Sequence, residues 1–120
     1  YFGEGTKTIS TTGKATITNM GAEIGATCSI FPYDEKGSDY LKATGREEIA
    51  ELANSRMDLL TADEEVLKNP ENYFNQVIEI NLDELEPHIV GPHTPDLARP
   101  ISGLKEDANA NDYPLKISSA

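Results

Sequence analysis

The chain has 120 residues, enough for one domain, and its 21 acidic against 10 basic side chains give a formal net charge of −11. A surface this acidic repels phosphate backbones and anionic lipids, which argues against nucleic acid and membranes as partners. No apolar run approaches the roughly 18 residues that cross a bilayer. The single cysteine, Cys28, excludes an internal disulfide and is consistent with a reducing compartment.

The chain opens on YFG, which resembles the end of a strand whose preceding residues are missing. We expect a segment excised from a longer polypeptide, with a processed mature protein as the alternative. The hydroxyl cluster Ser10, Thr11 and Thr12 is suited to capping a helix. A helix is therefore predicted from about residue 12 to 24, and Gly25 is expected to end it as the residue beyond the C-terminus.

The next segment, 26–33, is β-branched and aromatic, and it predicts a short buried strand that Pro32 stops. A short helix is expected to follow, capped by Asp34 and ended at Gly45. Apolar residues at helical spacing then predict a second helix within 46–60, with acidic residues at its start where the helix dipole favours them.

A third helix is expected to start at Thr61, because Glu64 lies three residues later as in a capping box, and to close at Pro70. Segment 75–85 alternates apolar and polar residues, which is the clearest pattern of a half-buried strand in the chain.

From residue 86 the composition changes, and four prolines within 86–102 predict an irregular but ordered path. Segment 104–112 is expected to form a polar turn or a short helix. The last eight residues predict a final strand, with Leu115 and Ile117 on one face. Several helices between two or more strands indicate an α/β layered domain.

Asn19 and Glu23 are four residues apart, so on the predicted helix they project from one face. Such a polar pair is usually solvated surface. The small residues Gly21, Ala22 and Gly25 weaken a helix, however, and indicate close packing against a second body. A carboxylate on such a face can titrate or bind a metal-bound water.

Other candidate sites are weaker. His88, His93 and Asp96 have the residue types of a metal site, but the proline-rich path between them favours histidines that hydrogen-bond a loop. Cys28, on the predicted buried strand, is interpreted as an inert apolar side chain. The glycine-containing stretches match neither GxGxxG nor GxxxxGK[ST], so no nucleotide-binding motif is present.

Two long stretches carry a family resemblance. The sequence STTGKATITNMGAEIGATCSIFP resembles the aconitase-family segment S-C-T-G-M-A-T-I-C-N-M-G-A-E-I-G-A-T and the F-P that follows it. YLKATGREEIAELA and VIEINLDELEPHIVGPHTPDLARPI are similar to later portions of the same enzyme, in the same order. The likeness covers nearly the whole chain and is weakest around residues 55–75.

The resemblance implies most of the second domain of a [4Fe–4S] hydro-lyase, an enzyme of the tricarboxylic acid cycle that interconverts citrate and isocitrate through cis-aconitate. It places the family's active-site amide and acid on Asn19 and Glu23. Asn19 would then hydrogen-bond near the cluster, and Glu23 would bond to the water or substrate hydroxyl on the labile iron. The resemblance also implies a three-layer α/β/α fold with a small, mainly parallel sheet, truncated at its N-terminal side, as one partial domain over residues 1–120.

The chain departs from the family motif at three positions. Thr11 and Thr18 stand where cysteines are common, and Lys14 stands where the motif has methionine. Those cysteines are not cluster ligands in the family, whose ligands come from sequence that this chain lacks. Because Cys28 is the single thiol, we expect no metal ligand in this chain and no hydratase activity from the chain alone.

The expected partners are the remaining domains of the parent enzyme and its tricarboxylate substrate. Two alternatives are a non-catalytic binding module on the same scaffold and a paralogous hydro-lyase acting on a homologue of citrate. An exposed sheet edge is expected to allow self-association. The expected location is the mitochondrial matrix or a bacterial cytoplasm.

Overall fold

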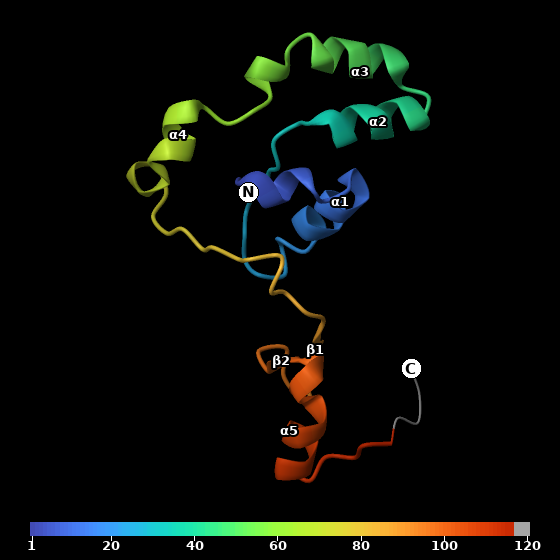
Figure 1. Ribbon diagram of the computed structural model, residues 1–120, viewed down its shortest axis with the longest axis vertical. Coiled ribbons are helices and arrows are strands. Elements are labelled where there is room, and N and C mark those ends of the chain that lie inside the picture. Colours follow the sequence, from blue (N-terminus) through green and yellow to red (C-terminus); the bar gives the residue numbers. More distant parts are fainter. Residues whose placement is uncertain (117–120) are drawn as a thin grey trace. The chain divides into compact units, whose positions relative to one another are not determined.

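The helices and strands of this chain are short, and their contacts divide it into two units, residues 1–78 and 79–120. The computed structural model describes residues 1–116, in which the first unit is helical and the second combines a β-hairpin with a helix (Figure 1). The expectation that residues 1–120 form one partial domain of a longer protein stays a prediction.

The first unit contains the helices α1 (Thr11–Asn19), α2 (Glu35–Ala43), α3 (Glu47–Asn54) and α4 (Glu64–Lys68), with 3-10 turns at Glu4–Lys7, Met57–Leu59 and Pro70–Asn72. The second unit contains the strands β1 (His88–Val90) and β2 (Ala98–Pro100), a 3-10 turn at Ile101–Gly103 and the helix α5 (Leu104–Ala110).

Helices α2 and α3 form the closest helix pair of the first unit (Figure 1). The predicted boundaries of α2 are confirmed: the Asp34 carboxylate caps its start, and Gly45 adopts a left-handed φ of 72° just beyond its end. Small side chains, Ser38 on α2 and Ala50 on α3, are buried. The Asn54 amide donates to the Ser38 hydroxyl at 3.0 Å, so a polar bond ties the end of α3 to α2.

The predicted start of the next helix is wrong. Helix α4 begins at Glu64 with Asp63 as its N-cap, and no side chain caps it. Glu64 is therefore the first helical residue and cannot complete a capping box with Thr61. Instead the Lys68 ammonium donates to the Glu64 carboxylate at 2.8 Å, one turn away. Pro70 opens the following 3-10 turn.

The two predicted strands at 26–33 and 75–85 are also wrong. Neither segment pairs with a strand within residues 1–116, and residues 82–84 of the second form a turn. Tyr33 N–H donates to the Leu60 carbonyl at 3.0 Å, which is a single link and not a ladder. Alternating apolar residues supply a face for burial but not the neighbouring backbone that a strand requires. Ile78 accordingly remains 75% exposed.

In the second unit β1 and β2 pair antiparallel, with His88 opposite Pro100, Ile89 opposite Arg99 and Val90 opposite Ala98. The guanidinium of Arg99 links the hairpin to α5. It donates to the Gly91 carbonyl, pairs with the Asp107 carboxylate and lies 5.8 Å from the centre of the Tyr113 ring. The alternative of a short helix within 104–112 is confirmed by α5.

The broad α/β class fits this mixture of helices and strands, but the three-layer arrangement with a mainly parallel sheet is wrong. The sheet of the described residues has two antiparallel strands, joined directly by residues 91–97. A parallel pair would need a longer crossover connection. Residues 113–116 form no strand, and Ile117, the other apolar residue of the predicted final strand, lies outside the described residues.

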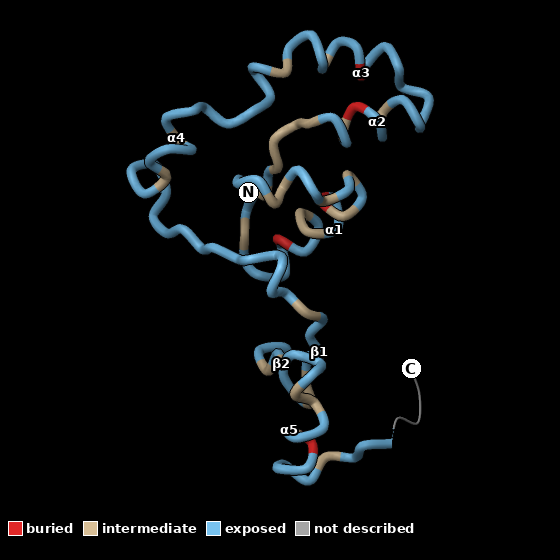
Figure 2. The backbone as a smooth tube through the Cα atoms, in the orientation of Figure 1, coloured by how far each residue is buried: buried red, intermediate tan, exposed pale blue. Residues whose placement is uncertain are grey.

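Few of the described residues are buried (Figure 2). Among the described residues, the buried apolar side chains are Ala50 in the first unit and Ala108 in the second. Large apolar side chains such as Leu59 and Ile80 are mostly exposed, at 72% and 63%. Within residues 1–116 no helix is long and apolar enough to span a bilayer. Each unit therefore presents apolar surface that its own described residues do not cover.

Candidate active-site turn

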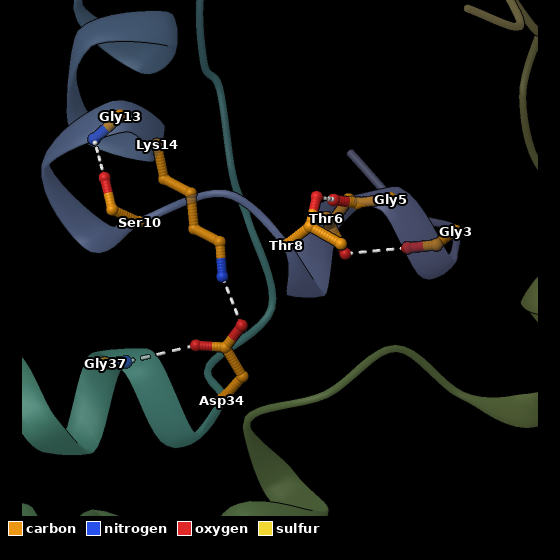
Figure 3. A network of polar contacts seen from close by, with 9 residues as sticks. All are labelled: Gly3, Gly5, Thr6, Thr8, Ser10, Gly13, Lys14, Asp34 and Gly37. Carbon is orange, nitrogen blue, oxygen red and sulfur yellow. Dashed lines mark hydrogen bonds and ion pairs between the residues drawn. The ribbon is translucent and has the colours of Figure 1, made fainter. Parts of the chain in front are cut away.

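Helix α1 leads to the candidate residues, and its start is fixed by a side-chain cap. The Ser10 hydroxyl accepts the N–H of Gly13 at 3.1 Å (Figure 3). This confirms the expected hydroxyl cap, although the helix begins at Thr11, one residue earlier than predicted. It ends at Asn19, where the following residue, Met20, still donates its N–H to Thr16 at 3.1 Å.

The buried side chain of α1 is Lys14, which is 7% exposed. Its ammonium bonds one carboxylate oxygen of Asp34, and the other oxygen accepts the N–H of Gly37 at 3.1 Å (Figure 3). One carboxylate therefore pairs with α1 and caps α2 at the same time. The ion pair fixes the helix that carries Asn19 against the neighbouring helix.

The environment of Asp34 favours its ionised form. Partial burial acts to raise the pKa of the carboxyl group. The hydrogen bonds from Lys14 and Gly37, together with the charge of Lys14, outweigh this effect and hold the pKa below its ordinary value of 3.8. The Asp34 carboxylate is therefore ionised at neutral pH.

Asn19 and Glu23 do not lie on one helix face, so this part of the prediction is wrong. Asn19 is the last residue of α1, whereas Glu23 lies in the turn that follows, over residues 20–25. Both residues are exposed, and no hydrogen bond among residues 1–116 occupies either side chain. An amide thus lies immediately before one tight turn and a carboxylate lies within it, and both are free to bind a ligand.

The turn is closed by two backbone bonds. Ala26 N–H donates to the Gly21 carbonyl at 2.9 Å, and Gly25 N–H donates to the Ala22 carbonyl at 3.1 Å. This is the bonding of a Schellman motif, with Gly25 in the left-handed position at a φ of 86°. Gly25 was expected to end the helix, and it does end a helical turn, but one separated from α1.

An open hollow lies beside α1, and it does not include Asn19 or Glu23. Its walls come from α1 and from the segment that leads into α2. Thr11, Lys14 and Thr18, the three positions that depart from the family motif, all line it, and so does Asp34. The three residues that differ from the family motif are therefore neighbours in space, grouped around the Lys14–Asp34 ion pair.

The other candidates remain apart. Cys28 is exposed, so the predicted buried position is wrong. His88 lies on β1, where its Nδ1 is 2.8 Å from the Glu86 carbonyl oxygen, and His93 and Asp96 lie in the hairpin loop. Within residues 1–116 no three His, Cys, Asp or Glu side chains converge as a metal site. His88 thus has the predicted role of a histidine that hydrogen-bonds a loop.

Sequence reasoning missed two contacts beside the candidate turn. One is the Lys14–Asp34 ion pair. Its signal in the sequence was a lysine at a position where the aconitase-family motif has methionine. The other is the approach of Ser29 to Gly21, for which the signal was a glycine between two polar candidates. Both contacts join segments that are distant in sequence, which a local pattern does not reveal.

Comparison with known proteins places this chain in a class of enzymes. The family model "Aconitase family (aconitate hydratase)" matches residues 1–118. The chain belongs to the aconitase family.

Several curated relatives carry the name aconitate hydratase, mitochondrial. The protein of Gracilaria gracilis is 55% identical over 118 residues, which cover 98% of this chain and 14% of the relative. A probable mitochondrial aconitate hydratase of Caenorhabditis elegans is 57% identical over 117 residues, and the Saccharomyces cerevisiae enzyme is 51% identical over 118, with the same coverage. The chain thus spans 14% of the length of these relatives.

Proposed function

We propose that this chain is part of a hydro-lyase that interconverts citrate and isocitrate through cis-aconitate, and that Asn19 and Glu23 form part of its active-site wall. The observation that carries the proposal is an exposed amide at the end of α1 and an exposed carboxylate within the tight turn that follows, in a chain of the aconitase family. Neither side chain is used to stabilise the described fold, which leaves both available to a substrate.

The two residue types suit the chemistry. Dehydration of a hydroxy acid moves a proton to or from a hydroxyl group, and a carboxyl group can accept or donate the hydrogen bond involved. An amide offers both a donor and an acceptor, so Asn19 can hold a hydroxyl or a carboxylate in place. We assign Glu23 to the reacting hydroxyl and Asn19 to its orientation.

Binding a tricarboxylate also requires cations, and this chain is poorly supplied with them. Its formal net charge is −11, so the chain repels an anionic substrate at long range. We propose that the basic residues that bind the substrate belong to the rest of the protein. The described segment then contributes hydrogen bonding and not charge attraction.

The family implies a [4Fe–4S] cluster, which cysteine thiolates hold. The residues of this chain do not fit the role of ligands, because Cys28 is the single cysteine and no metal-binding group converges within residues 1–116. We propose that the ligands lie elsewhere in the parent enzyme and that Asn19 lies outside the ligand set but close to the cluster. The mitochondrial names of the relatives support the mitochondrial matrix as its location.

The test uses the full-length enzyme that contains this segment. Glu23→Gln and Asn19→Ala are compared with Glu51→Gln, which removes an exposed carboxylate on α3. We expect Glu23→Gln to lower kcat for cis-aconitate hydration by roughly 100-fold or more, the usual contribution of a proton-transfer group. Asn19→Ala should lower kcat about tenfold to 100-fold, through lost orientation of the hydroxyl, and Glu51→Gln should leave kcat unchanged. Equal activity in all three would refute the assignment and favour a non-catalytic binding module.

A further inference from the structure

The turn between Asn19 and Glu23 contains one buried residue, Gly21, whereas residues 22–25 are exposed. The φ of Gly21 lies outside the left-handed region, so the backbone conformation does not by itself require glycine. The reason for glycine must therefore be space.

That space is taken by Ser29. A Cβ added to Gly21 would overlap the Ser29 hydroxyl oxygen and lie 3.3 Å from Ser29 Cβ and 3.1 Å from the Thr18 carbonyl oxygen. Rotation of the serine would move its hydroxyl but not its Cβ or the Thr18 carbonyl. A side chain at position 21 therefore requires the turn or its neighbours to shift by a few tenths of an ångström, even after the serine rotates.

The backbone of Gly21 also joins the two candidate residues. Its N–H donates to the Thr18 carbonyl of α1 at 3.2 Å, and its carbonyl accepts the N–H of Ala26 at 2.9 Å. The first bond fixes Gly21 to the helical turn that holds Asn19. The second closes the turn that holds Glu23. A displacement of Gly21 therefore changes the position of Glu23 relative to Asn19.

We propose that Gly21 is a positioning residue, whose close contact with Ser29 sets the geometry between the Asn19 amide and the Glu23 carboxylate. This inference rests on the proposed function of those two residues. Gly21 itself offers no side chain to a substrate, and it acts through the turn that it anchors.

The experiment compares Gly21→Ala, Ser29→Gly and the double variant in the full-length enzyme. Gly103→Ala is the matched control, because Gly103 has an ordinary φ of −89° and no atom within 4 Å of an added Cβ. We expect Gly21→Ala to lower kcat about tenfold to 100-fold, as for a reacting group displaced by a fraction of an ångström to one ångström. KM should change much less, Ser29→Gly should restore most of the loss, and Gly103→Ala should have no effect.

A second readout does not depend on turnover. Hydrogen exchange of the Ala26 amide, which donates to Gly21, should be faster in Gly21→Ala and return toward the wild-type rate in the double variant. Should Gly21→Ala fail to fold, Ser29→Val crowds the same contact from the opposite side and should also lower kcat. Wild-type kcat in Gly21→Ala, or a double variant no better than the single one, would overturn the inference.

Glu23→Gln in the same series separates the two proposals. If Glu23→Gln abolishes turnover while Gly21→Ala does not alter it, the positioning inference alone fails. If Glu23→Gln leaves turnover intact, both the proposed function of Glu23 and the positioning inference that rests on it fail.

Discussion

Lys14 and Asp34 form an ion pair that joins the middle of α1 to the N-terminus of α2 (Figure 3). The lysine side chain is 8% exposed and the aspartate side chain 21%. Because the same carboxylate caps α2, this pair is the main polar link between the helix that ends at Asn19 and the α2–α3 pair.

Asp34→Ala should destabilise this region strongly. The substitution leaves the Lys14 ammonium buried without its partner and removes the cap of α2, a combined loss of about 3 kcal/mol. Hydrogen exchange of the α2 amides in the full-length protein measures the local free energy of opening. Asp34→Asn is the matched control, since asparagine also caps helices and removes only the charge. Unchanged exchange in Asp34→Ala would show that the ion pair contributes nothing.

The same pair should make this region sensitive to acid. The pKa of Asp34 is below its ordinary value of 3.8 in the folded chain, so the unfolded chain binds the proton more tightly. The contribution of the Asp34 carboxylate to the free energy of unfolding is therefore complete above 3.8, its pKa in the unfolded chain. This contribution is lost as pH falls through the lower pKa of the folded chain. Exchange of the α2 amides, corrected for the intrinsic effect of pH, should increase below about pH 4 in the native sequence. Asp34→Asn should abolish this dependence, and an identical pH profile in both proteins would contradict it.

Local signals in the sequence predicted the limits of α2 well. Asp34 and Gly45 identified the limits of α2 because a cap and a left-handed glycine act within a few residues of themselves. Segment 75–85 has an equally clear pattern, yet it forms no strand within residues 1–116. A strand depends on a neighbouring backbone, and the pattern of one segment does not show whether that neighbour is present.

The candidate site was predicted only in part, because its geometry also depends on contacts that the pattern of one segment does not show. The residue types of Asn19 and Glu23 follow from the motif, but their geometry depends on where α1 stops. The helix ends at Asn19 and a separate turn carries Glu23, and the approach of Ser29 to Gly21 is part of that turn. A contact across eight residues of irregular chain leaves no periodic signal.

The isolated chain should neither hold an iron–sulfur cluster nor hydrate cis-aconitate. It has one cysteine, and cluster assembly requires several thiolates in one place. After anaerobic reconstitution with iron and sulfide, we expect no visible cluster absorbance on the desalted chain and no turnover. The full-length enzyme treated in the same way is the positive control. A stable cluster or measurable turnover from the chain alone would contradict the prediction.

The isolated chain should also self-associate through segment 77–85, which forms no strand within residues 1–116. Ile78 and Ile80 are 75% and 63% exposed, and the backbone around them pairs with no strand within residues 1–116. Such a segment can pair with its copy in a second chain, while the net charge of −11 opposes the approach. Light scattering should therefore show a mass that increases with concentration, and more steeply at about 0.5 M salt, where this repulsion is screened.

Variants identify the surface responsible for that association. Ile78→Lys combined with Ile80→Lys should keep the chain monomeric, because charge on an unpaired strand opposes edge pairing. Ile24→Lys is the matched control, since Ile24 is 79% exposed but lies in the turn after α1. A constant monomer mass for the native chain would contradict self-association. Equal suppression by Ile24→Lys would show that general apolar exposure, and not segment 77–85, is the cause.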